Sequence, residues 1–455
     1  MDRTPRWILV ERSLTGPGNH HYEYALHMAR AAGDAGFEVL VAGNLRMKTE
    51  SWGEVPATIR PTFRHTTYEV DASLGRATSA QKNAWATLVS LFGWRAGHPR
   101  QKEAYAREFA REVTDLLAGI EVSGQDHIFF PTLSVAELDG LARVWAAGIA
   151  SEATWYLQFH FELPEARTTS LRGPTPGGAN VIDPAVREWF RHAIRQGMCY
   201  RMLFFCPTRS MAERYNSLGV VTFRELPYPV RVVPAPRWPG HLPLRITCAG
   251  HARRDKGRAE LAQLVELLRE PLAEGTIQLY LQGARRKFRS LPRSVLHHPT
   301  AIRFVPHPLS GPEYARLIAT TDIGLFMYDP HTYRRRCSGV LVEMLAAGVP
   351  VVVPAGTWLA EQIVPAGAAV FDETCGSASW RHSTRKEPGR VGAVATHAGS
   401  FAAAIVHIVH HYRHYRESAA EFAVGWRKHH SAENVLQLML DAARNLPSSG
   451  KRSAG

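Results

Sequence analysis

Residues 333–348 read YRRRCSGVLVEMLAAG, and the apolar run VPVVVP follows at residues 349–354. Ser338 is a favourable N-cap residue and Gly348 a favourable helix terminator, so the apolar side chains between them predict a helix over residues 340–347. The valines that follow predict a buried strand, and another apolar run predicts a strand at residues 323–328. A strand, a loop, a helix and a second strand form the repeating unit of a parallel sheet. This stretch therefore predicts an α/β fold.

The same alternation extends from this stretch into both halves of the chain. The N-terminal half opens with an apolar strand at residues 7–11, a helix over residues 21–35 and a second strand at residues 37–42. Further helices are expected at residues 102–117, 136–149, 259–272, 312–320, 401–418 and 419–430, and further strands at residues 127–130, 154–159, 202–206, 244–249, 277–282, 302–305 and 368–371. We therefore predict two Rossmann-like, doubly wound domains, each with helices on both faces of a parallel sheet.

A proline-rich segment separates the two halves. Residues 226–243 contain six prolines, which is the composition of a domain linker. We expect an N-terminal domain over residues 1–230 and a C-terminal domain over residues 231–410. Helices over residues 411–447 are expected to pack back toward the N-terminal domain, and residues 448–455 are expected to form a disordered tail. Doubly wound sheets bind ligands beyond the carboxyl ends of their strands, so two such domains facing each other predict a central cleft.

The composition favours a globular protein of the cytoplasm. The 455 residues are 45% hydrophobic and 21% charged. No apolar run approaches the roughly 20 residues of a membrane span, and the first residues lack a signal-peptide pattern. The five cysteines are scattered, odd in number and not spaced as metal ligands, which favours a reducing compartment and argues against structural zinc.

The net charge of +13 suggests an anionic partner. The densest basic cluster is RRKFR at residues 285–289. A solvated basic face, an anionic membrane surface and a phosphorylated small molecule all remain open. Nucleic acid is not expected, because no nucleic-acid-binding motif accompanies the cluster.

A basic loop follows the strand predicted at residues 244–249. It reads GHARRDKG from Gly250 to residue 257 and includes Arg253 and Lys256. Cationic side chains at the carboxyl end of a strand, followed by a helix N-terminus, suit a phosphate group. The alternative is a solvated turn whose cations point into water.

The opening stretch supplies a second loop of this kind. Ser338 and Gly339 place a capping hydroxyl and bare backbone amides at a helix start, where a diphosphate could bind. Glu343 lies one turn further along the helix, within reach of a neutral diol such as a ribose. The alternative is an exposed glutamate beside a basic loop.

Two candidates lie in the N-terminal half. Residues 16–24 read GPGNHHYEY, and Gly18 there would permit a ligand to approach the backbone closely. A plain strand–helix turn is the alternative, and the pattern is not the GxGxxG of nicotinamide cofactors. His160 ends the strand predicted at residues 154–159, between two phenylalanines, where packing is the alternative to chemistry. The chain also lacks the GxSxG, Walker A and CxxC motifs, which argues against hydrolase, NTPase and redox functions.

In these motifs the chain resembles the family 4 glycosyltransferases of bacteria, which have the GT-B fold and retain the anomeric configuration. The segment from Ser338 to Pro350 is similar to the family's phosphate loop, ribose-binding glutamate and following AxGxPVV pattern. The loop at residues 250–257 resembles the family's other phosphate loop. The resemblance is specific in the C-terminal half and loose in the N-terminal half.

The resemblance implies transfer of a sugar from a nucleoside diphosphate to an acceptor hydroxyl, without a metal or other cofactor. It implies that the C-terminal domain binds the sugar donor and that the N-terminal domain binds a sugar, lipid-linked or small-molecule acceptor. Peripheral contact with an anionic membrane is a further expectation. Glu343 would bind the ribose, and His160 would lie near the sugar or acceptor. The residues expected at the sugar donor are Gly18, Gly250, Arg253, Lys256, Tyr333, Arg336, Ser338, Gly339, Val340 and Glu343, and those expected to act in catalysis are His160, Arg253, Lys256 and Glu343.

The sequence departs from the family pattern at two positions. The family carries a Glu-x7-Glu pair, but Arg335 stands where its first acid would be. His251 stands where an arginine is expected, and Arg253 could substitute for it. A non-catalytic nucleotide-binding protein of the same fold therefore remains an alternative. A sugar-nucleotide epimerase is a second alternative, but it would need acid and base carboxylates in the cleft, and Arg335 in place of the first acid does not support it.

Overall fold

The computed structural model divides into two compact units. Unit 1 contains residues 1–16, 21–227 and 432–455, and unit 2 contains residues 17–20 and 228–431. The structure describes residues 3–17, 20–52, 55–67, 69, 99–163, 182–195, 201–230, 242–250, 253–257, 260–291, 301–366, 368–371 and 391–446.

Unit 1 is built on a seven-stranded parallel sheet in the order β3-β2-β1-β4-β5-β6-β7. Its strands are β1 (Arg6–Val10), β2 (Glu38–Asn44), β3 (Ala57–Phe63), β4 (His127–Leu133), β5 (Thr154–Phe159), β6 (Met202–Cys206) and β7 (Phe223–Glu225). Its helices are α1 (His20–Asp34), η1 (Thr49–Trp52), α4 (Pro99–Ala118), α5 (Val135–Ala146), α6 (Pro184–Arg195), α7 (Arg209–Asn216) and α16 (Ala432–Arg444).

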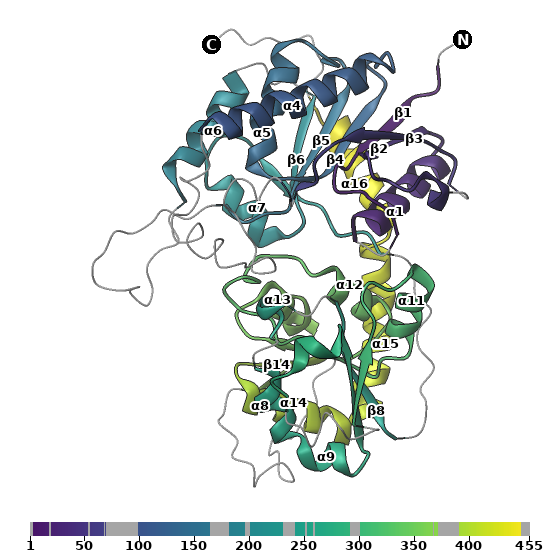
Figure 1. Cartoon of the computed structure of the whole chain (residues 1–455), viewed down its shortest axis with the longest axis vertical. Coiled ribbons are helices and arrows are strands. Elements are labelled where there is room, and N and C mark those ends of the chain that lie inside the picture. The colour runs from purple at the N-terminus through teal and green to yellow at the C-terminus, as the bar shows by residue number, and fades with distance from the viewer. Residues whose placement is uncertain are drawn as a thin grey trace. The chain divides into compact units, whose positions relative to one another are not determined.

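Helices cover both faces of this sheet (Figure 1). Apolar side chains of α4, α5, α6 and α7 form one buried core with residues of every strand. On the other face, the ring of Tyr24 in α1 lies 6.2 Å from that of Phe129 in β4. The central strands β1, β5 and β6 are buried along their whole length, as continuous apolar runs predict for strands covered on both faces.

Unit 2 repeats this architecture, with a seven-stranded parallel sheet in the order β10-β9-β8-β11-β12-β14-β13. Its strands are β8 (Leu244–Cys248), β9 (Ile277–Gln282), β10 (Ile302–Val305), β11 (Ile323–Leu325), β12 (Val351–Pro354), β13 (Ala369–Phe371) and β14 (Gly392–Ala395). Its helices are η3 (Arg254–Lys256), α8 (Leu261–Leu267), α9 (Arg269–Ala273), η4 (Arg285–Phe288), α11 (Gly311–Ala319), α12 (Gly339–Ala346), α13 (Trp358–Ile363), η5 (Val364–Ala366), α14 (Ala398–His410) and α15 (Tyr412–His429).

The prediction of two doubly wound α/β sheets is confirmed, although several element boundaries were wrong. The helix predicted at residues 259–272 is two helices that meet at Leu268. The break in the C-terminal helices lies at His411 rather than at residue 418, and it was missed because no glycine or proline marks the junction in the sequence. Strands β3, β7 and β14 were missed. Within the described ranges, no helix is both long and apolar enough to cross a membrane.

Candidate functional site

The strand order of unit 2 places two predicted loops at one point of the sheet. β8 pairs with β9 on one side and with β11 on the other, so the chain winds away from the β8–β11 pair in opposite directions. The loops that follow these two strands therefore open at the same carboxyl edge, where doubly wound sheets bind their ligands. These are the basic loop after β8, which the structure describes at Gly250 and residues 253–257, and the loop at residues 326–338, which leads into α12.

Glycines hold the basic loop in place. Gly250 has φ +94°, and a Cβ added there would lie 2.7 Å from Nζ of Lys256 and 3.6 Å from Cγ2 of Val340. The ammonium of Lys256 therefore lies against the Gly250 backbone, close to the start of α12. Gly257 has φ +76°, and its Cβ would lie 2.1 Å from the carbonyl oxygen of Met327. Only glycine fits there, and the close approach fixes the basic loop against the segment after β11.

Two buried tyrosines bring three cations together. The rings of Tyr328 and Tyr333 lie 4.4 Å apart. Arg253 donates a hydrogen bond from Nη2 to the Tyr333 hydroxyl at 3.0 Å. Nζ of Lys256 lies 4.9 Å from the centroid of the Tyr328 ring, and the Arg336 guanidinium lies 5.8 Å from that of Tyr333. The predicted residues Arg253, Lys256, Tyr333 and Arg336 thus form one cluster.

This cluster carries more positive than negative charge. Its carboxylate is Asp255, which pairs with Arg253 at 3.0 Å. Burial lowers the pKa of Lys256, and the charges of Arg253 and Arg336 lower it further. Cations held together in a partly buried place repel one another, so an anion that enters the cluster is favoured.

The N-terminus of α12 completes this side of the site. Ser338 is its N-cap, and the Ser338 hydroxyl accepts a hydrogen bond from the amide of Leu341 at 3.3 Å. A Cβ on Gly339 would lie 3.1 Å from the Tyr228 ring, which covers this end of the helix. One turn further, Glu343 is half-buried, and its Oε2 accepts a hydrogen bond from the hydroxyl of Tyr314 at 2.6 Å. The predicted phosphate-binding amides and the predicted ribose-binding acid therefore occupy successive turns of one helix.

Two further candidates, His160 and Gly18, belong to the N-terminal half of the chain. His160 follows β5 in unit 1, where its amide donates to the carbonyl of Leu133 at 3.4 Å and its ring meets the Tyr24 ring edge-on at 6.3 Å. It thus lies at the carboxyl edge of the first sheet, as expected. Gly18 lies outside the described residues.

Unit 1 contains a buried polar network that the sequence did not predict. It lies at the carboxyl ends of β1 and β4, which are the strands at the switch point of the first sheet. Arg12 follows β1 and forms an ion pair with Glu137 in the first turn of α5. Its guanidinium lies over the ring of Tyr105, 5.1 Å from the centroid, and its Nε donates to Thr67 at 3.0 Å. The SxxE pattern at residues 134–137, typical of a capping box, indicates the start of α5 but not the pairing of Glu137 with Arg12.

A carboxylate–imidazole pair lies in the same region. Nδ1 of His21 is 3.2 Å from Oε2 of Glu11, and both side chains are buried. Burial raises the pKa of Glu11, but the neighbouring His21 and hydrogen bonds outweigh burial and hold this pKa below its usual value. Glu11 is therefore ionised at neutral pH.

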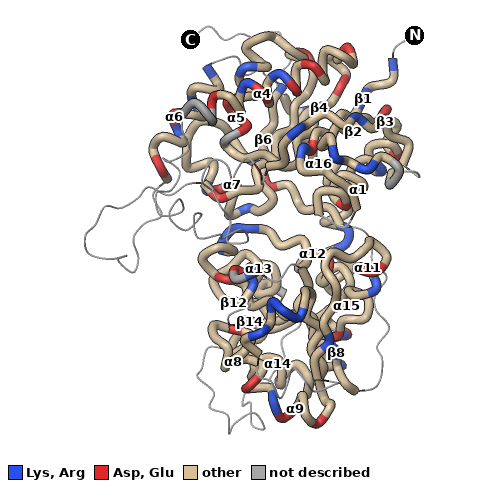
Figure 2. The backbone as a smooth tube through the Cα atoms, viewed as in Figure 1, with Lys and Arg blue, Asp and Glu red and all other residues tan. Residues whose placement is uncertain are grey.

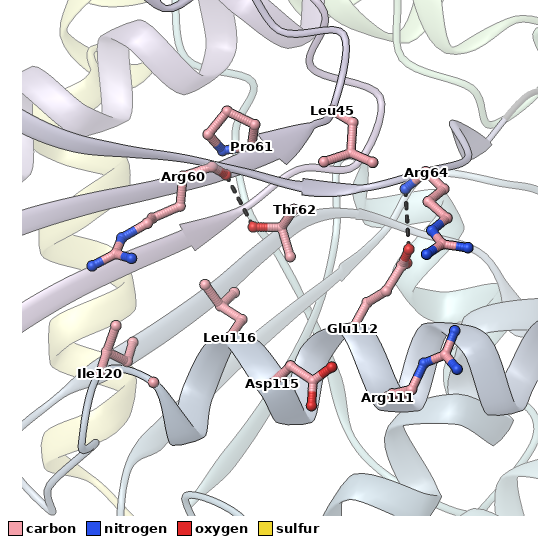
Figure 3. Close-up of a pocket in the computed structure, with 11 residues that line it drawn as sticks. Leu45, Arg60, Pro61, Thr62, Arg64, Arg111, Glu112, Asp115, Leu116 and Ile120 are labelled. Carbon is pink, nitrogen blue, oxygen red and sulfur yellow. Dashed lines mark hydrogen bonds between the residues drawn. The ribbon is translucent and has the colours of Figure 1, made fainter.

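A hollow of about 550 Å³ lies between β3 and α4 in unit 1 (Figure 3). Side chains of both charges line it, among them Arg60 and Arg64 from the β3 side and Asp115 from α4. The backbone amide of Arg64 donates to Glu112 at 3.1 Å across it. β3 is the edge strand, so this hollow lies away from the switch point at β1 and β4.

The described part of the chain contains no group of three or more His, Cys, Asp or Glu side chains that could hold a metal ion. Lys and Arg are distributed over both units (Figure 2).

Comparison with known proteins shows the fold. No protein-family model and no curated protein sequence matches the chain. Among solved structures, the sucrose-phosphate synthase of Thermosynechococcus elongatus is similar with a TM-score of 0.58 and 14% identity, over 98% of this chain and 99% of that one. The chain has the GT-B fold.

Two further GT-B structures are similar over almost their whole length. A UDP-forming α,α-trehalose-phosphate synthase from Burkholderia xenovorans has a TM-score of 0.59 and 13% identity, with 98% of this chain and 100% of that chain covered. A glycosyltransferase from Rickettsia africae has a TM-score of 0.58 and 10% identity, with 99% and 100% covered. Identities this low carry the fold alone, so the function must be argued from the site.

Proposed function

We propose that this GT-B protein transfers a sugar from a nucleoside diphosphate to an acceptor hydroxyl. The observation that carries the proposal is the meeting of two loops at the β8–β11 switch point. One loop brings Arg253 and Lys256, and the other brings the N-terminus of α12 at Ser338 and Gly339. Fixed cations and the amides of a helix N-terminus on two sides of one position suit a diphosphate.

The same arrangement suits the chemistry of glycosyl transfer. When the anomeric carbon–oxygen bond breaks, the diphosphate leaves with the electron pair and its negative charge grows. In this proposal Lys256, Arg253 and the α12 amides stabilise that charge, as preorganised donors and cations do at a developing oxyanion. The acceptor oxygen forms the new bond to the anomeric carbon, and its proton passes to the departing diphosphate. We propose retention of configuration and no metal, following the family resemblance.

The names of two similar structures agree with a sugar-nucleotide donor. One is a sucrose-phosphate synthase and the other a UDP-forming trehalose-phosphate synthase. We propose that unit 2 binds the sugar donor and that unit 1, with His160 at its sheet edge, binds the acceptor.

Nucleotide binding is the first property to measure. We expect one of UDP, GDP and ADP to raise the thermal unfolding midpoint, since a ligand at 100 times its Kd stabilises the native state by about 2.7 kcal/mol. Replacement of Arg253 by Ala should reduce the shift, because it removes a cation held at 3.0 Å from Tyr333. Arg269, an exposed arginine of α9 in the same unit, is the matched control, and Arg269→Ala should keep the full shift.

Each alternative function predicts a different result in this binding experiment and in an assay of sugar transfer with the nucleotide sugar that binds. Binding without transfer or donor hydrolysis on any acceptor would identify a nucleotide-binding protein. Interconversion of the donor sugar without transfer would identify an epimerase. If none of the nucleotides shifts the midpoint, the proposed function is wrong.

We also propose a cytoplasmic location with peripheral contact to an anionic membrane. Among the described residues, Cys206, Cys248 and Cys337 form no disulfide bond, which suits a reducing compartment. Arg285, Arg286 and neighbouring Lys287 lie in η4, where Phe288 is buried and anchors the turn.

The basic turn should bind anionic vesicles through electrostatics. We expect the protein to float with phosphatidylglycerol vesicles at low salt and to be released at high salt, since surface charges are screened within about 3 Å at 1 M salt. The variant Arg285→Glu/Arg286→Glu should lose flotation. Flotation that resists salt, or that the double variant retains, would contradict this proposal.

A further inference from the structure

A phenol holds the predicted ribose-binding acid from a neighbouring helix. The hydroxyl of Tyr314 in α11 donates to Oε2 of Glu343 in α12 at 2.6 Å. The two residues are 29 positions apart in the sequence. Helices α11 and α12 both begin at the carboxyl edge of the sheet, after β10 and β11, and this placement brings the two side chains together. A hydrogen bond this short to a carboxylate is of the strong, charge-assisted kind.

Helix α11 is itself firmly placed. It begins with a capping box in which the Ser310 amide donates to Glu313 at 2.9 Å, and Pro312 lies in its first turn. Leu317 and Ile318 bury its inner face. Tyr314 therefore reaches Glu343 from a helix whose start and inner face are both fixed.

The phenol acts as the donor and the carboxylate as the acceptor over the physiological pH range. Burial raises the pKa of Tyr314 well above its ordinary value, and the negative charge of Glu343 raises it further. The tyrosine thus stays protonated. A carboxylate has about four acceptor positions, and the bond from Tyr314 occupies one of them.

Fixing the carboxylate matters for recognition of a ribose. A glutamate without support samples several rotamers and loses that freedom when it binds a diol, which costs binding free energy. A site whose acid is already oriented binds the diol more tightly, and it rejects a sugar that lacks one hydroxyl more strongly.

We propose that Tyr314 is a positioning residue for Glu343, and that the pair makes this site select ribonucleoside over deoxyribonucleoside diphosphates. The inference rests on the proposed function, because it assumes that Glu343 faces a nucleotide ribose. It predicts that the nucleotide of the sugar donor carries a ribose rather than a deoxyribose.

The test is the ratio of two dissociation constants in titration calorimetry. UDP, GDP and ADP are compared with their 2′-deoxy counterparts, and the pair that binds is used. We expect wild type to favour the ribonucleotide by about tenfold or more, since an unpaired buried polar group costs about 1–3 kcal/mol, that is, five- to 150-fold. Tyr314→Phe should reduce the ratio several-fold, and Glu343→Gln should bring it near one.

Tyr412 provides a matched control within unit 2. Its hydroxyl donates to Asp322 at 2.7 Å, so it forms the same type of phenol–carboxylate bond. Asp322 precedes β11, at the opposite edge of the sheet. Tyr412→Phe should lower the unfolding midpoint but leave the ratio of the two dissociation constants at the wild-type value. If Tyr314 had only a structural role, Tyr314→Phe would give this same result.

The outcomes separate this inference from the proposed function. A wild-type protein that binds no nucleoside diphosphate contradicts the proposed function. Nucleotide binding with an unchanged ratio in Tyr314→Phe contradicts the inference alone, as does a wild-type protein that binds both nucleotides equally. The double variant Tyr314→Phe/Glu343→Gln should match Glu343→Gln, because Tyr314 acts through Glu343.

Discussion

Replacement of Lys256 by alanine is expected to lower the rate of glycosyl transfer by about 100- to 1,000-fold, the usual cost of losing one fixed group that stabilises a developing oxyanion. The ammonium of Lys256 lies against the backbone of Gly250, over the ring of Tyr328 and beside the start of α12. No other lysine lies in either loop at this switch point. The effect should appear in kcat with a saturating sugar donor, because the charge grows during bond breaking.

Lys428 is the matched control for this variant. It is an exposed lysine of α15 in the same unit, so Lys428→Ala makes the same chemical change away from the loops. We expect it to keep transfer within about twofold of wild type, since exposed charges contribute little. A Lys256→Ala protein that retains kcat within threefold of wild type would remove Lys256 from the diphosphate site.

The sequence predicted the structure best where local residue patterns determine the secondary structure. The segment from Ser338 to Gly348 combines an N-cap, an apolar helix and a terminating glycine, and the structure has α12 at Gly339–Ala346. Strand β14 was missed for a physical reason. A Cβ on Gly392 would lie 2.1 Å from the carbonyl oxygen of Val351, so the strand begins with a glycine and reads GAVA. The close packing that places β14 beside β12 also removes the bulky residues that would have revealed it.

The site shows the same limit of sequence reasoning. Two loops were predicted to bind phosphate because each follows a strand and carries basic or small residues. Tyr314 was not predicted to belong with them, because its contact with Glu343 depends on how α11 packs beside α12. The pairing of Arg12 with Glu137 spans 125 positions and appears in no local pattern. Periodicity describes one element at a time, whereas these contacts depend on the strand order.

Replacement of Arg12 by methionine is expected to lower the free energy of unfolding of unit 1 by about 3–5 kcal/mol, the usual cost of breaking one partner from a buried ion pair. The Arg12 side chain is 4% exposed and that of Glu137 is 0% exposed, so the variant leaves a carboxylate without its cation inside the protein. Glu137 keeps the amide of Ser134 as a hydrogen-bond donor at 2.8 Å, which cannot balance the lost charge. Urea unfolding followed by fluorescence should show an earlier first transition.

A second substitution and a variant of an exposed ion pair test why Arg12→Met loses stability. Glu137→Gln in the Arg12→Met background removes the stranded charge and should restore part of the lost stability, because the loss comes from an uncompensated buried carboxylate. Arg143 forms an ion pair with Glu103 at 2.8 Å whose side chains are 42% and 36% exposed, so Arg143→Met should cost less than about 1 kcal/mol. If Arg12→Met and Arg143→Met unfold at the same urea concentration, the Arg12–Glu137 pair does not hold the first sheet edge together. If instead the double variant regains stability, the loops after β1 and β4 depend on this charge balance for their shape.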